Sequence, residues 1–313
     1  MAGVGIVIVT YNSQAEIGAC LDAALPRCTD LVVVDNASGD GTVGEVQRRG
    51  ARLIGNRENR GFAAAVNQGV AALNCSYILL LNPDAVLKTG VEPLQAACDL
   101  PGSAGAGGCM MNADGSPQVG FMVRALPTPS ALILEALLLN RIWPHNSVNQ
   151  RYRGLHLDYS KRIEVEQPAG AFLMFRRAVW SELGGFDEGF HPLWFEDVDF
   201  CRRVRDRGYR LYYVPDAVVN HTGGHSIPQL PVEVRRFYWY RSLLRYSAKY
   251  FRPAELKGVS LAVVVGSLLR AMGESFRCVT LRPFAGSGRI VRLAGQCFRA
   301  GWADGKNITV RRF

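Results

Sequence analysis

The chain has few of the features that mark secreted proteins. Its eight cysteines include no C-x-x-C pair and no spacing typical of a zinc site or a disulfide framework. No basic run precedes the first apolar residues, and the apolar segment at residues 4–9 is too short for the core of a signal peptide. We therefore expect a protein of the reducing cytoplasm, in which residues 4–9 belong to a first β-strand.

Long apolar runs and phosphate-binding loops are also absent. The longest uncharged apolar run, residues 258–269, lies between Lys257 and Arg270 and is shorter than the ~20 residues that cross a bilayer. It predicts no transmembrane helix. The chain contains no G-x-x-x-x-G-K-[ST] loop, and no G-x-G-x-x-G follows the first strand. These absences argue against nucleotidyltransferases and other nucleotide-diphosphate enzymes that use such loops.

Basic residues are concentrated at one end of the sequence. Residues 235–313 hold 16 Lys and Arg against three acidic residues, so the net charge of +9 divides into +13 there and −4 in residues 1–234. Apolar stretches and the aromatic run at residues 237–240 lie among these charges. This composition favours an anionic membrane surface over nucleic acid as partner, while a solvated basic tail that packs on the core is the plainer alternative.

Residues 1–100 alternate strand-like and helix-like segments with short loops between them, which is typical of a parallel sheet covered by helices. The first helix is expected to begin with a capping box formed by Ser13 and Glu16. Strands are expected at residues 5–10, 31–35, 52–54 and 77–81, and helices at residues 13–24, 43–49 and 62–73. Gly-rich strand material follows at residues 103–109, and the pattern of residues 110–165 fits no regular element.

Polar residues follow each of the four strands. In open α/β sheets, ligands bind beyond the carboxyl ends of the strands. Asp35 and Asn36 are placed there to accept hydrogen bonds from a ribose or a base, and Asp84 is placed to hold a divalent cation with water and diphosphate oxygens. Taken singly, each of these positions is equally compatible with an ordinary turn.

A dense acidic cluster occurs at residues 196–199, beside Trp194 and Phe195 and at the start of a predicted helix. Glu196 and Asp197 are candidates for a general base, a role worth roughly 10²–10⁴ in rate. Carboxylates in a first helical turn also favour the helix dipole, so part of this pattern has a structural explanation.

A second candidate site lies further along the chain. His221 ends a predicted strand and precedes a glycine pair and His225, which suits a metal ligand or a diphosphate contact. A loop histidine without a ligand is the plainer alternative.

With these residues in view, the chain resembles the family-two glycosyltransferases of the A-type fold, and especially their rhamnosyltransferase-like bacterial branch. The likeness covers residues 4–226. It rests on ordered motifs at family-like spacing: I-V-I-V-T-Y-N-S (6–13), V-V-V-D-N-A-S-G-D-G-T (32–42), N-R-G-F-A-A-A-V-N-Q-G (59–69), L-L-L-N-P-D-A (79–85), and G-A-F-L-M-F-R-R, G-G-F-D-E-G-F and F-E-D-V-D-F-C-R-R (within 170–203).

The resemblance implies an α/β protein with the A-type glycosyltransferase fold, a Rossmann-like mixed central sheet with helices on both faces, and a C-terminal helical basic region. Residues 1–100 would form the half that binds the nucleotide sugar, residues 101–226 the acceptor-binding and catalytic half, and residues 227–313 a region that associates with the membrane. The implied nucleotide-binding residues are Thr10, Tyr11, Asn12, Asp35, Asn36, Asn59, Gly61, Asn67 and Asp84.

The resemblance also implies the chemistry. Mg²⁺ or Mn²⁺ would be bound by Asp84, together with His221. Asn82 stands where the family's D-x-D motif has its first Asp, so the diphosphate must supply more of the coordination. Asp197 would be the catalytic base, with Glu196 as the second candidate. Trp194 and Phe195 would line the acceptor side, although core packing explains both aromatics equally well.

The implied reaction is an inverting transfer of L-rhamnose from dTDP-rhamnose to a polyprenyl-diphosphate-linked glycan, in the synthesis of a cell-surface polysaccharide. A UDP-hexose donor is the alternative within the family. The protein would be cytoplasmic and peripheral at the inner face of the plasma membrane, bound through residues 235–313, without a specific nucleic-acid partner. A non-catalytic lipid- or nucleic-acid-binding protein is the alternative of another class, and it leaves the acidic cluster unexplained.

Overall fold

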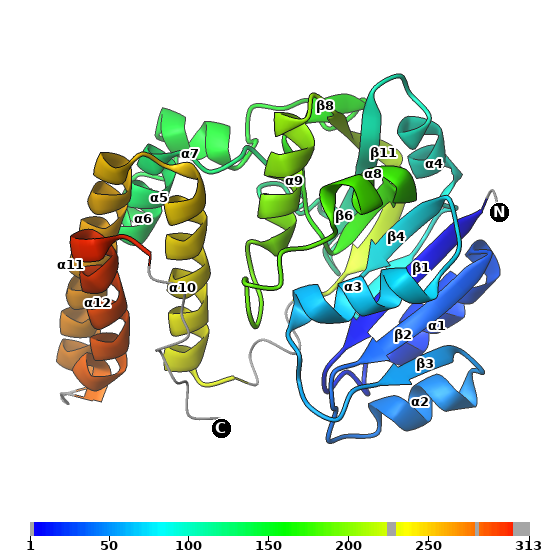
Figure 1. Ribbon diagram of the computed structural model, residues 1–313, viewed down its shortest axis with the longest axis horizontal. Helices are drawn as coiled ribbons and strands as arrows, with labels where there is room; N and C mark the ends of the chain where they lie inside the picture. Colours follow the sequence, from blue (N-terminus) through cyan, green and yellow to red (C-terminus); the bar gives the residue numbers. More distant parts are fainter. Residues whose placement is uncertain (1–2, 224–229, 279–281, 303–313) are drawn as a thin grey trace. The chain divides into compact units, whose positions relative to one another are not determined.

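The computed structural model describes residues 3–223, 230–278 and 282–302 (Figure 1). The chain divides into two compact units. The first comprises Met1–Leu126 and Arg151–Leu230, and the second comprises Pro127–Gln150 and Pro231–Phe313. Residues 127–150, which lie within the stretch whose sequence pattern fits no regular element, thus belong with the C-terminal helices.

A nine-stranded mixed sheet forms the centre of the first unit. Its path runs β3-β2-β1-β4-β10-β6-β11-β5, and β8 pairs with β11. β1 to β4 are parallel, and β10 lies antiparallel between β4 and β6. The strands are β1 (Val4–Thr10), β2 (Asp30–Asp35), β3 (Arg52–Gly55), β4 (Tyr77–Leu81), β5 (Ala85–Leu87), β6 (Ser103–Met111), β8 (Ile163–Val165), β10 (Phe172–Arg176) and β11 (Arg210–His221), and a separate ladder joins β7 (Val123–Arg124) to β9 (Gln167–Pro168).

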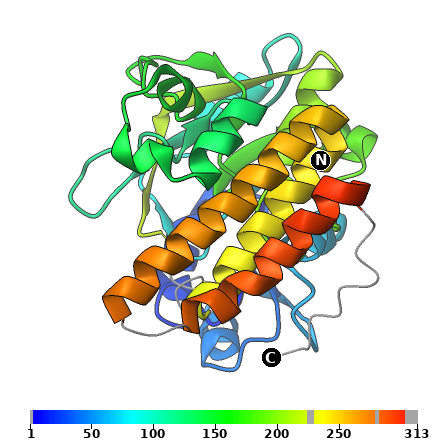
Figure 2. The same ribbon diagram turned by 90° about the vertical axis from the view of Figure 1, so that its left-hand side faces the viewer.

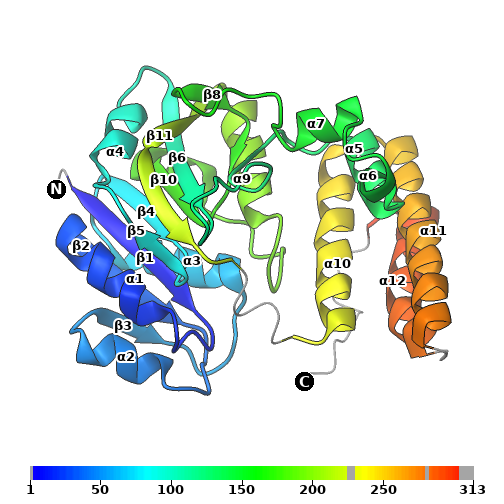
Figure 3. The same cartoon turned by 180° about the vertical axis from the view of Figure 1, so that it is seen from behind.

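Helices cover both faces of this sheet, as Figures 1 and 3 show from opposite sides. Alternate residues of β1 point to different faces: Ile6 and Ile8 belong to one buried apolar cluster with α1 and α4, and Val7 belongs to another with α3, α8 and α9. This double burial explains why the strand sequences are continuously apolar. The helices are α1 (Ile17–Ala24), α2 (Thr42–Arg48), α3 (Phe62–Ala72), α4 (Glu92–Cys98), α8 (Arg177–Leu183) and α9 (Glu196–Asp206), with a 3₁₀ turn η1 (Leu25–Arg27). α7 (Ser147–Tyr152) contains the point in the sequence at which the second unit gives way to the first.

The structure confirms the predicted strands and the α3 helix, but the predicted capping box is wrong. The first helix begins at Ile17, and Glu16 occupies its N-cap without a side-chain capping bond. Ser13 instead uses its backbone N–H to donate to the Thr42 hydroxyl, 2.8 Å away, and its carbonyl accepts from Ile17. The loop between β1 and α1 is therefore tied to α2, and this contact between distant segments outweighs the local capping preference.

The second unit is helical. It contains α5 (Pro129–Ala136), α6 (Leu139–Ile142), α10 (Val232–Tyr250), α11 (Pro253–Cys278) and α12 (Arg282–Ala300). Figure 2 shows α10, α11 and α12 lying side by side. Thr128 caps α5 by accepting a hydrogen bond from the Ala131 N–H at 3.2 Å.

α11 is longer and more apolar than the sequence run predicted. Pro253–Phe276 has a mean hydropathy of 1.5 over its most apolar window, and 44% of that window is buried within the protein. By length and composition this stretch meets the requirement for a membrane span, which the core helices of soluble domains also meet. The prediction counted only the uncharged run, whereas the helix continues through Lys257 and Arg270.

The close packing of β6 against β10 can be tested at Gly105. A Cβ at Gly105 would overlap the Met174 carbonyl oxygen of β10 and lie 3.1 Å from the Phe175 Cα, whereas a Cβ at Gly44, in α2, would meet no atom within 4 Å. Gly105→Ala should therefore lower the free energy of unfolding by about 1–3 kcal/mol, because backbone must move. Gly44→Ala should raise it by roughly 0.5–1 kcal/mol. Urea denaturation of both variants checks this, and equal effects would contradict the close β6–β10 packing.

Candidate active site

The carboxyl ends of β1 and β2 are joined by a buried carboxylate. Thr10 and Asp35 are register partners, and the Thr10 hydroxyl donates to Asp35 Oδ1 at 2.8 Å. The Ser38 hydroxyl donates to the same oxygen at 2.5 Å, and the Ser38 N–H donates to Oδ2 at 2.9 Å. Asp35 thereby holds the β2 loop against β1. Among the described residues, its Oδ2 accepts a single bond and keeps capacity for a further donor.

The loops after these strands are linked a second time through Asn12. This residue adopts a left-handed conformation, with φ at 52°. Its N–H donates to the Ser38 hydroxyl and its Oδ1 accepts from the Gly39 N–H, each at 2.8 Å. Tyr11, beside it, is half-buried. The structure thus brings Thr10, Tyr11 and Asn12 to the same edge as Asp35.

Asn36 connects the third loop of this edge. Its Nδ2 donates to the Gly61 carbonyl at 3.1 Å, and its Oδ1 accepts from the Asn56 side chain at 3.0 Å. Asn59 Oδ1 accepts from the Gly61 N–H at 2.9 Å. Gly61 has a φ of +85°, and a Cβ there would lie 2.7 Å from the His191 ring. The residues that follow β1, β2 and β3 therefore form one hydrogen-bonded edge.

Asn67 lies elsewhere, and its expected place at the nucleotide is not what its contacts support. It belongs to α3, and its two amide hydrogens go to the Phe186 carbonyl and the Glu188 carboxylate, each at 3.0 Å. Its Oδ1 accepts from the Phe186 N–H at 2.9 Å. Because these bonds use both of its donors, Asn67 acts as an anchor for residues 186–188.

Asp84 and His221 form a buried pair beyond β4 and β11. The His221 Nε2 lies 3.5 Å from Asp84 Oδ1, and both side chains are under 10% exposed. β5 brings them together, since His221 pairs with Ala85. The Thr222 N–H and hydroxyl also donate to the Asp84 carbonyl, which fixes the chain on both sides of the pair.

The tautomer of His221 follows from Gln118. The Gln118 Nε2 donates to the His221 carbonyl at 2.6 Å and to Asn112 Oδ1 at 2.9 Å, so its Oε1 faces His221 Nδ1 at 2.9 Å and must accept from it. Burial lowers the pKa of the His221 imidazole, partly offset by Asp84. A neutral ring with its proton on Nδ1 turns the Nε2 lone pair toward a carboxylate oxygen.

Two acceptors that face one another in a buried place suit a cation. His221 Nε2 has no hydrogen-bond partner among the described residues. No group of three or more His, Cys, Asp or Glu side chains gathers as a metal site in the part of the chain that the structure describes. The pair would therefore supply two ligands, and a diphosphate and water the others. His225, the second histidine of this region, lies outside the described residues.

Asp197, in the first turn of α9, is held by the segment before β10. Its Oδ2 accepts from the Gly170 N–H at 2.9 Å and from the Gln167 side chain at 3.2 Å, and its Oδ1 accepts from the Val198 N–H at 2.8 Å. Burial raises the pKa of this carboxyl, and the hydrogen bonds from Gly170 and Val198 oppose that increase. A half-buried carboxylate with a raised pKa and a fixed orientation has the properties of a general base.

The same short segment reaches the Asp84 loop. The Asn82 N–H donates to the Ala171 carbonyl at 3.0 Å, one residue after Gly170. A Cβ at Gly170 would lie 3.1 Å from the Cβ of Asp197, so the absence of a side chain allows the close approach. Residues 170–171 thus connect Asp197 to the loop that carries Asp84.

Glu196 and Phe195 are less accessible than the sequence suggested. Glu196 is 6% exposed, and its Oε2 has no hydrogen-bond partner in the described part of the chain. Burial, with Asp197 adding to the effect, raises the pKa of Glu196 well above its usual range. Phe195 is buried at 3% exposure, so its ring belongs to the core and not to an acceptor surface. Trp194 is half-buried and stays a candidate.

Gln118 and Gln167 are the contributors that the sequence did not reveal. Both lie outside the motifs that carry the family resemblance, and a single glutamine in the sequence carries no signal for the partner that it will contact. Gly170 begins the G-A-F-L-M-F-R-R motif, but nothing in the sequence indicated that it contacts Asp197.

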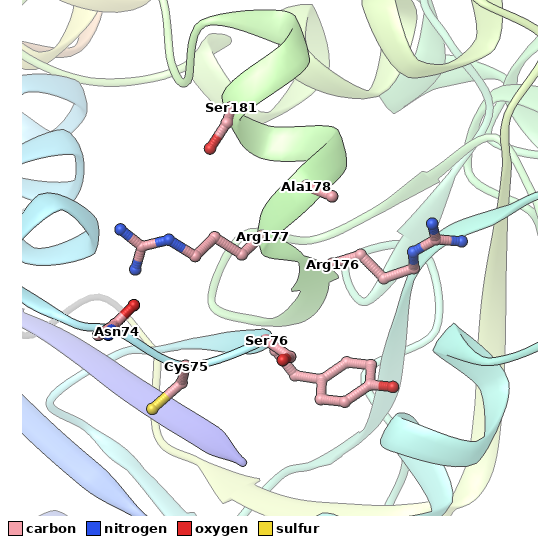
Figure 4. Close-up of a pocket in the computed structure, with 8 residues that line it drawn as sticks. Asn74, Cys75, Ser76, Arg176, Arg177, Ala178 and Ser181 are labelled. Atoms are coloured by element: carbon pink, nitrogen blue, oxygen red, sulfur yellow. The ribbon is translucent and has the colours of Figure 1, made fainter. Parts of the chain in front are cut away.

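A pocket of about 430 Å³ lies at the other end of β4 and is separate from this site (Figure 4). It lies around residues 74–77 and the start of α8. Its two arginines point in different directions in Figure 4. Arg176 donates to the Ser103 carbonyl at 3.1 Å, and Arg177 donates to the carbonyls of Val70 and Leu73 at the end of α3. These contacts give both arginines a structural role.

The buried state of Glu196 predicts a pH dependence of stability. Its pKa is raised in the folded protein, so above about pH 4.3, the usual value for Glu, the folded state binds more protons than the unfolded state. Stability is then lost as pH rises toward the folded pKa. Glu196→Gln should flatten this decline, and Glu58→Gln, at an exposed position, should leave it unchanged. Thermal unfolding from pH 4 to 9 measures both, and parallel curves for wild type and Glu196→Gln would contradict the assignment.

Comparisons with known proteins identify the family. Residues 5–184 match the model of glycosyl transferase family 2, and residues 147–285 match that of glycosyl transferase family group 2. The chain is 30% identical over 244 residues to the N-acetylglucosaminyl-diphospho-decaprenol L-rhamnosyltransferase of Mycobacterium tuberculosis, covering 72% of this chain and 78% of that protein. It is 26% identical over 204 residues to the rhamnosyltransferase WbbL of Escherichia coli, covering 63% of this chain and 71% of that protein.

Solved structures show the same fold. The mannosyltransferase PcManGT of Pyrobaculum calidifontis, solved with GDP-Man and Mn²⁺, superposes with a TM-score of 0.53 at 16% identity, over 95% of this chain and 87% of that one. Residues 1–349 of TarS from S. aureus superpose with a TM-score of 0.50 at 16% identity, over 96% and 92% of the two chains. The fold is therefore the A-type glycosyltransferase fold, and the chain belongs to glycosyl transferase family 2, in its rhamnosyltransferase-like branch, and is a glycosyltransferase.

Proposed function

We propose that the protein transfers a sugar from a nucleoside diphosphate to a hydroxyl of a glycan acceptor, with inversion at the anomeric carbon. The observation that carries this proposal is the link through residues 170–171. It holds the Asp197 carboxylate on one side and the loop of Asp84 on the other. A base and a diphosphate site on two sides of one rigid segment suit attack on the face opposite the leaving group.

Asp197 is the base of this proposal. It takes the proton of the acceptor hydroxyl as that oxygen attacks the anomeric carbon. Gly170 and Gln167 position the carboxylate, and its raised pKa favours holding the proton once it is transferred. Glu196 is the weaker candidate, because burial raises the pKa of that carboxyl and so disfavours its ionised form.

Asp84 and His221 would hold Mg²⁺ or Mn²⁺ with the donor diphosphate. The buried Nε2 lone pair opposite the Asp84 carboxylate supports this assignment. When bound, the cation neutralises the charge that develops on the departing diphosphate. Asn82 lacks the charge of an aspartate, so the chain alone should bind the metal weakly.

The hydrogen-bonded edge after β1, β2 and β3 would receive the nucleoside. Asp35 offers the spare acceptor capacity of Oδ2, and the loops of Asn12 and Asn59 are held in place around it. In this proposal residues 1–100 form the donor-binding half and residues 101–226 the acceptor-binding and catalytic half. Trp194 lies on the acceptor side.

The donor and acceptor are proposed from the relatives. Two of them are named as rhamnosyltransferases, and one name gives a diphospho-decaprenol acceptor. These names favour dTDP-L-rhamnose as donor and a polyprenyl-diphosphate-linked glycan of a cell-surface polysaccharide as acceptor, with a UDP-hexose as the alternative donor. Such an acceptor would place the enzyme at the cytoplasmic face of the plasma membrane, where the basic C-terminal region meets anionic lipid.

Asp197→Asn tests the base. It removes the proton acceptor while keeping the size of the side chain, so the turnover number should fall by roughly 10²–10⁴ with nucleotide affinity unchanged. Asp206→Asn makes the same chemical change at an exposed position of α9 and should keep full turnover. Sugar transfer measured under saturating donor separates the variants. If Asp197→Asn keeps its activity, the base lies elsewhere.

Calorimetric titration with dTDP and with UDP, each with and without Mg²⁺ or Mn²⁺, tests the donor site. One nucleotide should bind more tightly with metal, and Asp84→Asn should reduce that enhancement by about tenfold or more, because a ligand is lost. Asp206→Asn again serves as the matched control. Failure of the wild type to bind either nucleotide under any condition would overturn the proposed function.

A further inference from the structure

One face of α11 is apolar and exposed. It carries Leu261, Val265, Leu268, Leu269, Met272 and Phe276, whose exposed fractions run from 38% to 82%. Their spacing of three, four and seven residues places them on a single stripe of the helix. A helix at the surface of a soluble domain normally shows charged residues on such a face, so this stripe needs an explanation.

Two charged residues in the second half of α11, Arg270 and Glu274, are half-buried. Glu274 pairs with Arg236 of α10, with one guanidinium contact at 2.8 Å and another at 2.5 Å. Arg270 is half-buried and acts electrostatically on both Glu274 and Tyr240 of α10. α11 is therefore apolar on two faces: Val259, Val263 and Ala271 are buried against its neighbours, and the exposed stripe is a second apolar face.

α6 adds a second apolar element to this surface. Ile142 is 82% exposed and Trp143 is 68% exposed. α6 follows α5, which packs against α11, and Arg141 of α6 acts on the pKa of Glu274. A Cβ at Gly266 would overlap the Ala136 carbonyl at the end of α5, so the two segments are in contact.

The arrangement suits a helix that lies in the membrane interface better than one that crosses the bilayer. The face opposite the exposed stripe packs on α10 and α12 and carries the Arg236–Glu274 ion pair. Crossing would take these helices and their charges into hydrocarbon, at several kcal/mol for each unpaired charge. Only the exposed stripe and α6 need to enter the lipid if the unit lies flat.

The charge of this region indicates whether a membrane or a second copy of the chain covers the exposed stripe. The region from residue 235 carries +13, with Lys257 exposed at the start of the stripe and Arg289, Arg292 and Arg299 exposed on α12. Two copies would bring like charges together, whereas an anionic bilayer attracts them. Tryptophan at the edge of the surface is typical of the headgroup region.

We propose that the exposed stripe of α11 and the α6 residues Ile142 and Trp143 form a docking surface that inserts into the interface of an anionic membrane. This inference rests on the proposed function, since docking brings the enzyme to a lipid-linked acceptor. It assigns a role to residues 127–150, because Ile142 of α6 is as exposed as Phe276, the most exposed residue of the stripe.

Vesicle binding of the full-length chain tests the surface. Ile142→Glu and Leu269→Glu, both at exposed positions on different helices, should each weaken binding to phosphatidylglycerol–phosphatidylcholine vesicles by about tenfold or more, because an apolar anchor is replaced by an anion. Gln296→Glu makes the same change in net charge at an exposed position of α12 and gives the electrostatic part of the loss, which should be smaller. Acyl-brominated lipid should quench a fluorescence component that Trp143→Phe removes.

The outcomes that overturn the proposal are distinct. Equal binding by Ile142→Glu, Leu269→Glu and Gln296→Glu would remove the docking surface. If the wild type sediments as a dimer without lipid and Leu269→Glu sediments as a monomer, the stripe would be a contact with a second copy. Resistance to alkaline carbonate extraction would make α11 a spanning helix. Nucleotide titration of the same samples separates this inference from the proposed function: lost vesicle binding with intact nucleotide binding supports docking, and absent nucleotide binding counts against the catalytic proposal alone.

Discussion

The geometry of the candidate active site depends on two hydrogen bonds made by the peptide groups of neighbouring residues. Gly170 donates to Asp197, and Ala171 accepts from Asn82. Both precede β10, the antiparallel strand between β4 and β6. Because β10 is inserted in the centre of the sheet, the turn before it lies beside the end of β4 and beneath the start of α9. The candidate base and the candidate diphosphate site are therefore held by the sheet itself.

Two adjacent carboxyl groups in α9 show how burial divides their roles. Asp197 receives three donors and is half-buried, whereas Glu196 is buried and keeps one oxygen without a partner. Burial raises the pKa of both, but only Asp197 has groups that orient its charged form. Successive residues of a helix project about 100° apart. Glu196 is therefore buried while Asp197, the next residue, is partly exposed.

The sequence predicted the features that local pattern determines. Continuous apolar segments located β1, β2 and β4, and the polar residues after them lie together at one edge because parallel strands end on the same side. The sequence did not predict the contacts between segments that are far apart along the chain. Ser13 gave a local capping signal but bonds to Thr42, and Asn67 belonged to a family motif but binds residues 186–188. Gln118 fixes the tautomer of His221 across 103 positions of sequence, a separation that no local pattern records.

The link at Gly170 and Ala171 has a consequence for how such an enzyme can diversify. Residues 170 and 171 contribute to it only their peptide groups, and it requires that residue 170 have no side chain beyond the hydrogen atom of a glycine. Loops that contact sugars can change their residues freely without altering the spacing between the two chemical centres. In a scaffold of this kind, the residues that select the substrate can evolve independently of the contacts that position the reactive groups.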